Sequence, residues 1–259
     1  MRYSRQLGQV FLKDKKYIKK ILSYLEKEKE EYFLEIGPGR GEMTQYLAKK
    51  VKFLYAIEVD FRLFNLLKEK FSSFSNIEVI YKDILEFPLS ELNKKLVIFA
   101  NTPFQISTSL IKYLIKNRSF IKKCFLTFQK EFTQKLIAKE SKDYTFLSCY
   151  IQYYAKVEKL FDIPRKAFSP SPKVDASFIH LEFYLSLPYK AENESFLFRL
   201  IRRAFCKRRK KIINALPVLK NKEDLLSSLN INSQARAEQI TLQKYVFLAN
   251  ELYKKTKLV

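Results

Sequence analysis

The sequence predicts an α/β fold with a parallel sheet, followed by a small all-helical domain. Short apolar runs alternate with helix-periodic segments across residues 14–128, which is typical of a parallel sheet covered on both faces. The pattern changes over residues 162–172, where several prolines favour an extended, irregular loop. From Ser195 onward only helical periodicity remains. We therefore divide the chain of 259 residues into domains at 1–187 and 188–259.

The elements of the first domain follow from apolar spacing and capping residues. Asp14 can cap a helix whose apolar face repeats at Ile18, Ile21 and Leu25. The predicted strands, each a short apolar run, are Tyr32–Ile36, Phe53–Ile57, Ile77–Tyr81, Leu96–Ala100, Phe125–Phe128 and Ser177–Tyr184. The predicted helices, each with an apolar stripe, are Lys15–Leu25, Met43–Lys50, Phe61–Phe71 and Ser107–Lys116.

The charge balance indicates a polyanionic partner. Lys and Arg number 49 against 27 Asp and Glu, which gives a net charge of +22. This excess favours nucleic acid ahead of a membrane surface; a lysine-rich composition that only solvates the surface is the alternative. Cations concentrate near the C-terminus, where phosphate contacts would give affinity without base specificity. The residues predicted to make them are Arg202, Arg203, Lys207, Arg208, Arg209 and Lys210.

Cysteine and histidine usage argues against a metal centre and a disulfide framework. Cys124, Cys149 and Cys206 are isolated from one another, and His180 is the only histidine. His180 lies in a stretch of alternating polar and apolar residues and is interpreted as a strand residue. One histidine is enough for a Ser-His-Asp triad, but the sequence places no serine motif near it. No run of 18 apolar residues and no signal-peptide core occurs, so we expect a cytoplasmic protein that does not enter a membrane.

Three of the four glycines fall within five residues and predict a ligand loop. Gly37, Gly39 and Gly41 lie in Glu35-Ile-Gly-Pro-Gly-Arg-Gly, between a predicted strand and helix. Glycine lets the backbone approach a ligand closely or adopt positive φ. The spacing is G-x-G-x-G, and Glu35 would repel phosphate, so the loop favours a nucleoside of neutral or positive chemistry over a dinucleotide pyrophosphate. Gly8 is assigned to the same site.

Acidic residues follow the next two strands, at the sheet edge where ligands bind. Glu58 ends a strand and is placed to bind both ribose hydroxyls, with Asp60 as a second choice. Asp83 follows the next strand and could receive the amino group of an adenine. A solvated carboxylate at a strand end is the alternative for Glu58, and a helix cap or loop residue is the alternative for Asp83.

Asn101-Thr-Pro-Phe104 ends the fourth strand and is the most specific element. The Asn101 side-chain carbonyl and a backbone carbonyl held by Pro103 can accept both hydrogens of an exocyclic amine, while Phe104 can stack on the base. The lone pair of adenine N6 is delocalised, so orientation and polarisation carry the rate. The base must also leave its stack. Asn101, Pro103 and Phe104 are the predicted catalytic residues; a tight turn with an Asn cap and a core Phe is the alternative.

The motifs, in this order, resemble those of the ribosomal RNA adenine N6-dimethyltransferases of the KsgA type. Gly8-Gln-Val-Phe-Leu12 is similar to the family's G-Q-N-F-L, Glu35–Gly41 to E-I-G-P-G-x-G, and Asn101–Phe104 to N-L-P-Y. The remaining similarities are Phe168–Asp175 to F-x-P-x-P-K-V-D, Cys206–Asn214 to Q-R-R-K-x-L-x-N, and Arg236–Glu238 to R-A-E.

The resemblance implies a Rossmann-like, S-adenosylmethionine-dependent methyltransferase domain at 1–187 and a helical domain at 188–259 that binds RNA or the ribosome. The implied activity is dimethylation of N6 on adjacent adenosines of small-subunit (16S-type) rRNA during ribosome biogenesis, without a metal. The implied partner is a preribosomal 30S particle, chosen by shape, and the expected state is a monomer. The implied cofactor-binding residues are Val10 and Leu12 at the methionine end, Gly37 beneath it, Glu58 at the ribose, Asp83 at the adenine amine, and Asn101 between cofactor and target.

Three positions depart from the family pattern. Val10 replaces an Asn and removes a hydrogen-bonding side chain near the cofactor, while Thr102 and Phe104 replace Leu and Tyr. Phe104 keeps a stacking face but lacks a hydroxyl. These departures leave open the mono- or dimethyl product and a ribosome-assembly factor with weakened catalysis. An Erm-type methylase of large-subunit rRNA shares the N-terminal motifs, but the tail motifs favour the KsgA type.

Overall fold

The computed structural model describes residues 10–29, 31–101, 104–216 and 222–257, which form two compact units. The first unit contains the described residues up to Thr133 together with Val157–Phe183. The second contains residues 134–156 and the described residues from Tyr184 onward. The C-terminal stretch of the second unit starts at Tyr184, close to the predicted boundary at 187. The unit also contains residues 134–156, where the sequence pattern indicates no element. The boundary itself stays a prediction.

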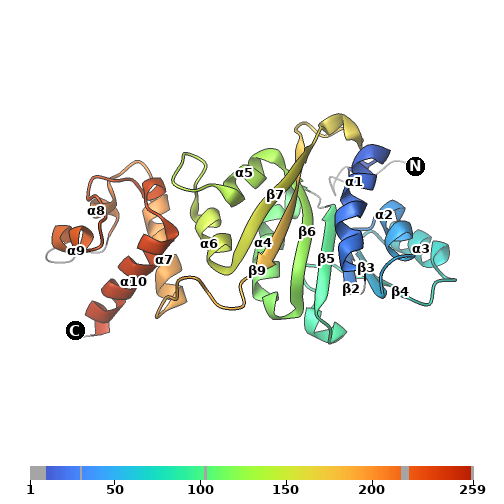
Figure 1. The fold of residues 1–259 in the computed structure, drawn as a ribbon, viewed down its shortest axis with the longest axis horizontal. Helices are drawn as coiled ribbons and strands as arrows, with labels where there is room; N and C mark the ends of the chain where they lie inside the picture. The colour runs from blue at the N-terminus through green and yellow to red at the C-terminus, as the bar shows by residue number, and fades with distance from the viewer. Residues whose placement is uncertain (1–9, 30, 102–103, 217–221, 258–259) are drawn as a thin grey trace. The chain divides into compact units, whose positions relative to one another are not determined.

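A seven-stranded sheet in the order β4-β3-β2-β5-β6-β9-β7 organises the fold (Figure 1). The pairs from β4 to β6 are parallel, whereas β9 is antiparallel to β6. The register sets Ile36 of β2 beside Ile57 of β3 and Ala100 of β5, so these strands end together. The strands are β2 (Tyr32–Ile36), β3 (Phe53–Glu58), β4 (Ile77–Tyr81), β5 (Leu96–Asn101), β6 (Ile121–Gln129), β7 (Ala155–Ile163) and β9 (Ala176–Phe183).

The sheet is mixed, whereas the sequence pattern predicts a parallel sheet. The antiparallel β9 and the edge strand β7 follow two helices, α5 (Lys130–Ile137) and α6 (Phe146–Tyr154), that the apolar pattern does not reveal. β7 carries charged residues at several positions and is only partly buried, as is common for an edge strand. Its sequence therefore lacks the continuous apolar run by which the buried strands are recognised.

Both faces of the central strands β2, β5 and β6 are buried. Phe33, Val97 and Phe125 belong to a core cluster that also contains residues of α1 (Lys15–Leu25) and α2 (Glu42–Leu47). The alternate residues, such as Leu34, Ile98 and Leu126, point to the other face and are fully buried as well. The side chain of Asp14 accepts a hydrogen bond from the Lys16 N–H, so the predicted cap of α1 is confirmed. The remaining helices of this unit are α3 (Phe61–Lys70) and α4 (Ser107–Lys116).

A two-stranded ribbon ties the N-terminal segment to the proline-rich loop. β1 (Phe11–Leu12) pairs antiparallel with β8 (Phe168–Ser169), and the Lys13 and Asp14 N–H groups donate to the Ala167 carbonyl at 2.9 and 3.2 Å. This pairing joins two of the sequence motifs that stand more than 150 residues apart. Residues 11–14 are thereby held against the proline-rich loop within the first unit.

The second unit is helical. Around Phe198 of α7, the rings of Tyr150, Tyr153 and Tyr154 from α6 form an aromatic cluster with centroid separations of 4.8 to 5.8 Å. No described helix of the chain is both long and apolar enough to cross a membrane. The C-terminal helices are α7 (Glu194–Cys206), α8 (Ile212–Ala215), α9 (Lys222–Ser228) and α10 (Leu242–Lys257).

Candidate active site

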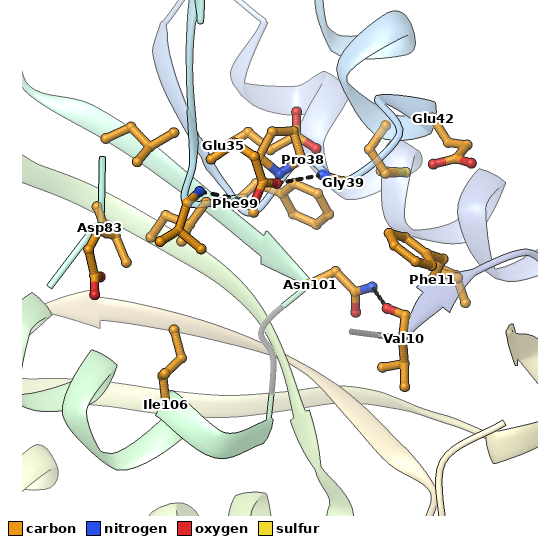
Figure 2. Close-up of a pocket in the computed structure, with 18 of the residues that line it drawn as sticks. Val10, Phe11, Glu35, Pro38, Gly39, Glu42, Asp83, Phe99, Asn101 and Ile106 are labelled. Atoms are coloured by element: carbon orange, nitrogen blue, oxygen red, sulfur yellow. Dashed lines mark hydrogen bonds between the residues drawn. The ribbon is translucent and has the colours of Figure 1, made fainter. Parts of the chain in front are cut away.

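A cavity lies at the carboxyl ends of the parallel strands, where the fold class predicts a ligand site. Figure 2 shows side chains from β1, the glycine loop and the ends of β3, β4 and β5 around it. All six residues expected to bind a cofactor line this one cavity: Val10, Leu12, Gly37, Glu58, Asp83 and Asn101.

The glycine loop needs glycine at three positions for different reasons. Gly37, Gly39 and Gly41 have φ values of +66°, +62° and +77°, which side chains disfavour. A Cβ at Gly37 would meet open space, because this glycine faces the cavity. At Gly39 a Cβ would lie 2.7 Å from the Phe11 ring, and at Gly41 it would lie 2.8 Å from Phe71. Gly37 therefore leaves room for a ligand, whereas Gly39 and Gly41 leave room for neighbouring aromatic side chains of the protein.

Glu58 is the buried acidic group of the site. Its carboxylate accepts hydrogen bonds from the N–H groups of Gly39 at 3.2 Å, Val59 at 3.0 Å and Asp60 at 2.9 Å. These bonds fix the carboxylate and still leave lone pairs for a ligand. Burial outweighs them and raises the pKa of Glu58. The Gly39 N–H thus serves Glu58 rather than standing free for a ligand.

Asp60, the second choice for the ribose, has a structural role. It caps α3 by accepting from the Arg62 N–H at 3.0 Å, and its carboxylate also pairs with the Arg62 guanidinium at 3.0 Å. The hydrogen bond from that guanidinium lowers the pKa of Asp60. These partners occupy the Asp60 carboxylate, which leaves Glu58 as the stronger ribose candidate.

Glu35 contributes a second buried carboxyl to the cavity wall. It is 2 % exposed, and its Oε2 finds no hydrogen-bond partner among the described residues. Burial raises the pKa of Glu35 to about 8, against a smaller lowering by the Thr44 side chain. A buried polar atom without a partner is costly. Its place in the wall gives the site a carboxyl that can hydrogen-bond a ligand and that can ionise when a cationic ligand binds.

Asn101 lies opposite the N-terminal segment. Its Nδ2 donates a long hydrogen bond of 3.4 Å to the Val10 carbonyl, which Figure 2 shows as a dashed line. The bond uses the amide nitrogen and leaves the Oδ1 acceptor for another donor. Because Val10 precedes the β1–β8 ribbon, the position of this carbonyl is linked to the proline-rich loop.

The other predicted residues of the site differ in how the structure places them relative to the cavity. The Asp83 carboxylate lines the cavity and accepts from the Leu85 N–H at 2.9 Å. Phe104 is half-buried against the core cluster and is not among the described lining residues. Gly8, Thr102 and Pro103 lie outside the described residues. The roles assigned to these residues stay predictions.

Sequence reasoning missed several residues of the cavity wall. Val59 and Lys82 stand next to predicted site residues, so adjacency could have indicated them, whereas Gln105 and Ile106 depend on the turn after β5. Within the described residues there is no group of three or more His, Cys, Asp and Glu side chains that could hold a metal ion.

The predicted phosphate-binding residues belong to the second unit. Arg202, Arg203, Lys207, Arg209 and Lys210 are exposed. Arg208 differs, since its Nε lies 3.3 Å from the Glu238 carboxylate and its guanidinium donates to the Lys142 carbonyl.

Arg208 therefore joins the two C-terminal sequence motifs. The Ile212 N–H also donates to the Ala235 carbonyl at 2.7 Å, and Lys211 bridges Arg236 in the backbone. The basic motif and the Arg-Ala-Glu motif are thus parts of one local structure.

The chain is similar to known proteins over nearly its whole length. A family model described as Ribosomal RNA adenine dimethylase matches residues 2–254. A relative from Fusobacterium nucleatum, named Ribosomal RNA small subunit methyltransferase A, is 34% identical over 254 residues, which cover 95% of this chain and 96% of the relative. The crystal structure of a dimethyladenosine transferase from Plasmodium falciparum superimposes with a TM-score of 0.80 at 27% identity, and the match covers 95% of this chain and 98% of that one.

A second solved structure bears on the fold alone. The 23S rRNA methyltransferase ErmE has a TM-score of 0.75 at 23% identity, over 94% of this chain and 99% of its own. The fold is therefore that of a Rossmann-like methyltransferase domain with a helical C-terminal part. Together with the full-length match to the family model and the curated relatives, this shows that the chain belongs to the ribosomal RNA adenine dimethylase family.

Proposed function

We propose that this methyltransferase uses S-adenosylmethionine to dimethylate N6 of adjacent adenosines in small-subunit rRNA, on a preribosomal particle. The observation that carries the proposal is one cavity that brings the glycine loop, Glu58, Asp83 and Asn101 together. The names of the curated relatives support the small subunit, as do the C-terminal motifs that Arg208 joins. Because its proposed substrate is ribosomal RNA, the protein would act in the interior of the cell.

The residues of the cavity fit this cofactor. Glu58 would hold the ribose and Asp83 the adenine amine, and Gly37 leaves open space beside them. The unpartnered Oε2 of Glu35 suits the positive charge of the methionine end. When bound, S-adenosylmethionine supplies an electrophilic methyl group on a sulfonium. The chain's own task is then to present the target amine.

Asn101 would perform that task. Its Oδ1 can accept an N6 hydrogen while Nδ2 remains bonded to the Val10 carbonyl, which orients the amine toward the cofactor end of the cavity. A backbone carbonyl beside Pro103 would accept the second hydrogen, and Phe104 would stack on the base after its turn adjusts. No strong base is required, because proximity and polarisation lower the barrier.

The proposal is tested by incubating the protein with labelled S-adenosylmethionine and undermethylated small subunits, followed by mapping of the methylated adenines. Label in two adjacent adenosines of small-subunit rRNA is the expected result. Label in large-subunit rRNA would support an Erm-type activity. Bound cofactor without any transfer would support an assembly factor, the alternative that Val10 and Phe104 favour.

Substitutions at two glycines should separate binding from stability. Gly37→Ala places a methyl group in the open cavity, so we expect cofactor affinity to fall at least tenfold, with a loss of roughly 1–2 kcal/mol of stability from its positive φ. Gly41→Ala adds a clash with Leu67 and Phe71, so a loss of roughly 2–4 kcal/mol is expected with affinity retained in the folded fraction. Calorimetric titration and urea unfolding measure the two. Equal effects of both substitutions on affinity would contradict the assignment.

Substitutions in the basic tail, residues 202–210, should likewise separate RNA binding from stability. Arg209→Gln with Lys210→Gln is expected to weaken RNA binding and to reduce the slope of log K against log salt by about 0.7–0.9 for each lost phosphate contact. Arg208→Gln breaks the ion pair with Glu238 and should instead lower stability by roughly 1 kcal/mol. Filter binding over a salt series and thermal unfolding distinguish them. An unchanged slope in the double variant would exclude these two side chains from the RNA contact.

A further inference from the structure

A basic surface on the first unit begins beside the candidate active site. β1 lines the cavity, and Lys13 follows it directly. The sequence of α1, KKYIKKILSYL, contains no acidic residue. Its exposed lysines include Lys16 and Lys20, which are one helical turn apart and share a side of the helix.

The fold adds further cations to this side. The Tyr17 and Tyr24 rings lie 6.4 and 6.0 Å from that of Phe161, and the Lys20 ammonium lies 4.1 Å from the same ring, so α1 packs along β7. The turn that follows β7, η6 (Arg165–Ala167), accepts the hydrogen bonds of Lys13 and Asp14. Figure 1 shows this yellow turn beside the blue helix α1.

Residues from the proline-rich loop complete the surface. The Arg165 guanidinium donates to the Lys173 carbonyl at 3.3 Å and holds the two residues together. Arg165, Lys166 and Lys173 are all exposed. We call this surface the α1 face; its cations are Lys13, Lys16, Lys20, Arg165, Lys166 and Lys173.

The cations of the α1 face outnumber the acids beside them. In the part of the chain that the structure describes, none of its six cations forms an ion pair. The nearby acids make other contacts, and two of these contacts are to backbone N–H groups of the face itself. Asp162 pairs with Lys130 at 3.1 Å, Asp14 caps α1, and Asp175 accepts from the Arg165 N–H at 2.9 Å.

We propose that the α1 face binds the sugar-phosphate backbone of the RNA helix next to the target adenosines. This inference rests on the proposed function, which supplies RNA as the substrate. β1 forms part of the cavity wall, and the α1 face starts at Lys13, the residue after β1, so this face lies near an RNA strand whose base enters the cavity. Flexible, exposed lysines suit phosphates, which require charge rather than fixed geometry. The face gives affinity without reading sequence, and it is separate in the chain from the basic tail.

The test compares two triple variants that lower the net charge equally. Lys16→Gln, Lys166→Gln and Lys173→Gln neutralise half of the α1 face. Lys49→Gln, Lys112→Gln and Lys116→Gln neutralise three exposed lysines of the same unit that also lie outside the ion pairs of the described residues. The probe is a labelled RNA stem-loop with two adjacent adenosines in its loop, titrated from 50 to 300 mM salt. S-adenosylhomocysteine binding and thermal unfolding verify that both variants are intact.

The face variant is expected to bind the stem-loop at least tenfold more weakly and to reduce the salt slope by about two to three, whereas the control variant changes neither. Unchanged binding by the face variant, or equal losses in both variants, would overturn the proposal. Normal stem-loop binding with lost binding to the small subunit would also overturn it, in favour of an acidic protein partner. Failure of the unsubstituted protein to methylate any rRNA would refute the proposed function, yet the binding comparison would remain readable.

Discussion

Replacing Asn101 with alanine is expected to lower the rate of methyl transfer by about 10²–10³-fold while most RNA binding is retained. The Asn101 Oδ1 is the acceptor that would orient the target amine, and its Nδ2 bond to the Val10 carbonyl positions that oxygen. The alanine variant loses both. Single-turnover transfer from labelled cofactor measures the rate, and filter binding measures RNA affinity.

Two further variants make the Asn101 result specific. Asn65→Ala removes an exposed asparagine from α3 and should leave the rate unchanged. Asn101→Asp keeps acceptor oxygens but loses the donor to Val10, so its rate should lie between those of wild type and Asn101→Ala. Full activity of Asn101→Ala would refute the role of the side chain in presenting the amine.

Replacing Glu35 with glutamine should stabilise the empty protein, by an amount that grows with pH. Burial raises the pKa of Glu35 from 4.5 to about 8. Between these values the folded state holds a proton that the unfolded chain has released, so wild-type stability falls as pH rises from 4.5 to 8. Glutamine removes this loss, and the advantage of the variant should grow by up to roughly 1.4 kcal/mol for each pH unit. Urea unfolding at pH 5, 6, 7 and 8 measures it.

The same substitution should weaken binding of a cationic cofactor. A positive ligand favours the ionised carboxyl and lowers its pKa, so binding to wild type should release a proton and strengthen from pH 6 to 8. Glu35→Gln should show weaker binding without this proton release, detected by calorimetry in buffers of different ionisation enthalpy. Exposed Glu86→Gln is the control. Identical pH profiles of stability in wild type and Glu35→Gln would mean that Glu35 is already ionised in the empty protein.

The bounds of strands made largely of apolar residues could be predicted from the sequence, whereas the bounds of strands that contain more than one charged residue could not. The predicted bounds of β2, β4 and α4 are confirmed. Those of β2 and α4 follow from apolar spacing set by burial, whereas β4 is recognised by its short apolar run although it is only partly buried. The pattern locates β6 only at Phe125–Phe128, since two lysines, Lys122 and Lys123, follow the first residue of the strand, Ile121. These lysines pair with Glu31 and Glu28, residues distant in sequence that only the fold brings near.

The candidate site was predictable where it depends on strand ends. Parallel strands bring their carboxyl ends together, so residues such as Glu58 and Asn101 could be grouped by their positions in the sequence. The unpartnered oxygen of Glu35 could not be foreseen, since it depends on burial from all sides. Nor could the packing of Phe104, because a short turn rather than the strand directs its ring.

The helical unit is discontinuous in sequence, and this limits where the gene can be divided. A fragment ended at residue 187 would keep α6 but lose α7 and α10, the helices on which it packs. Tyr153, whose ring lies 5.4 Å from that of Phe198, would lose this neighbour, and the Tyr144 ring would lose Phe205 at 5.9 Å. Transplanting or swapping the C-terminal part between relatives therefore has to carry residues 134–156 along with it.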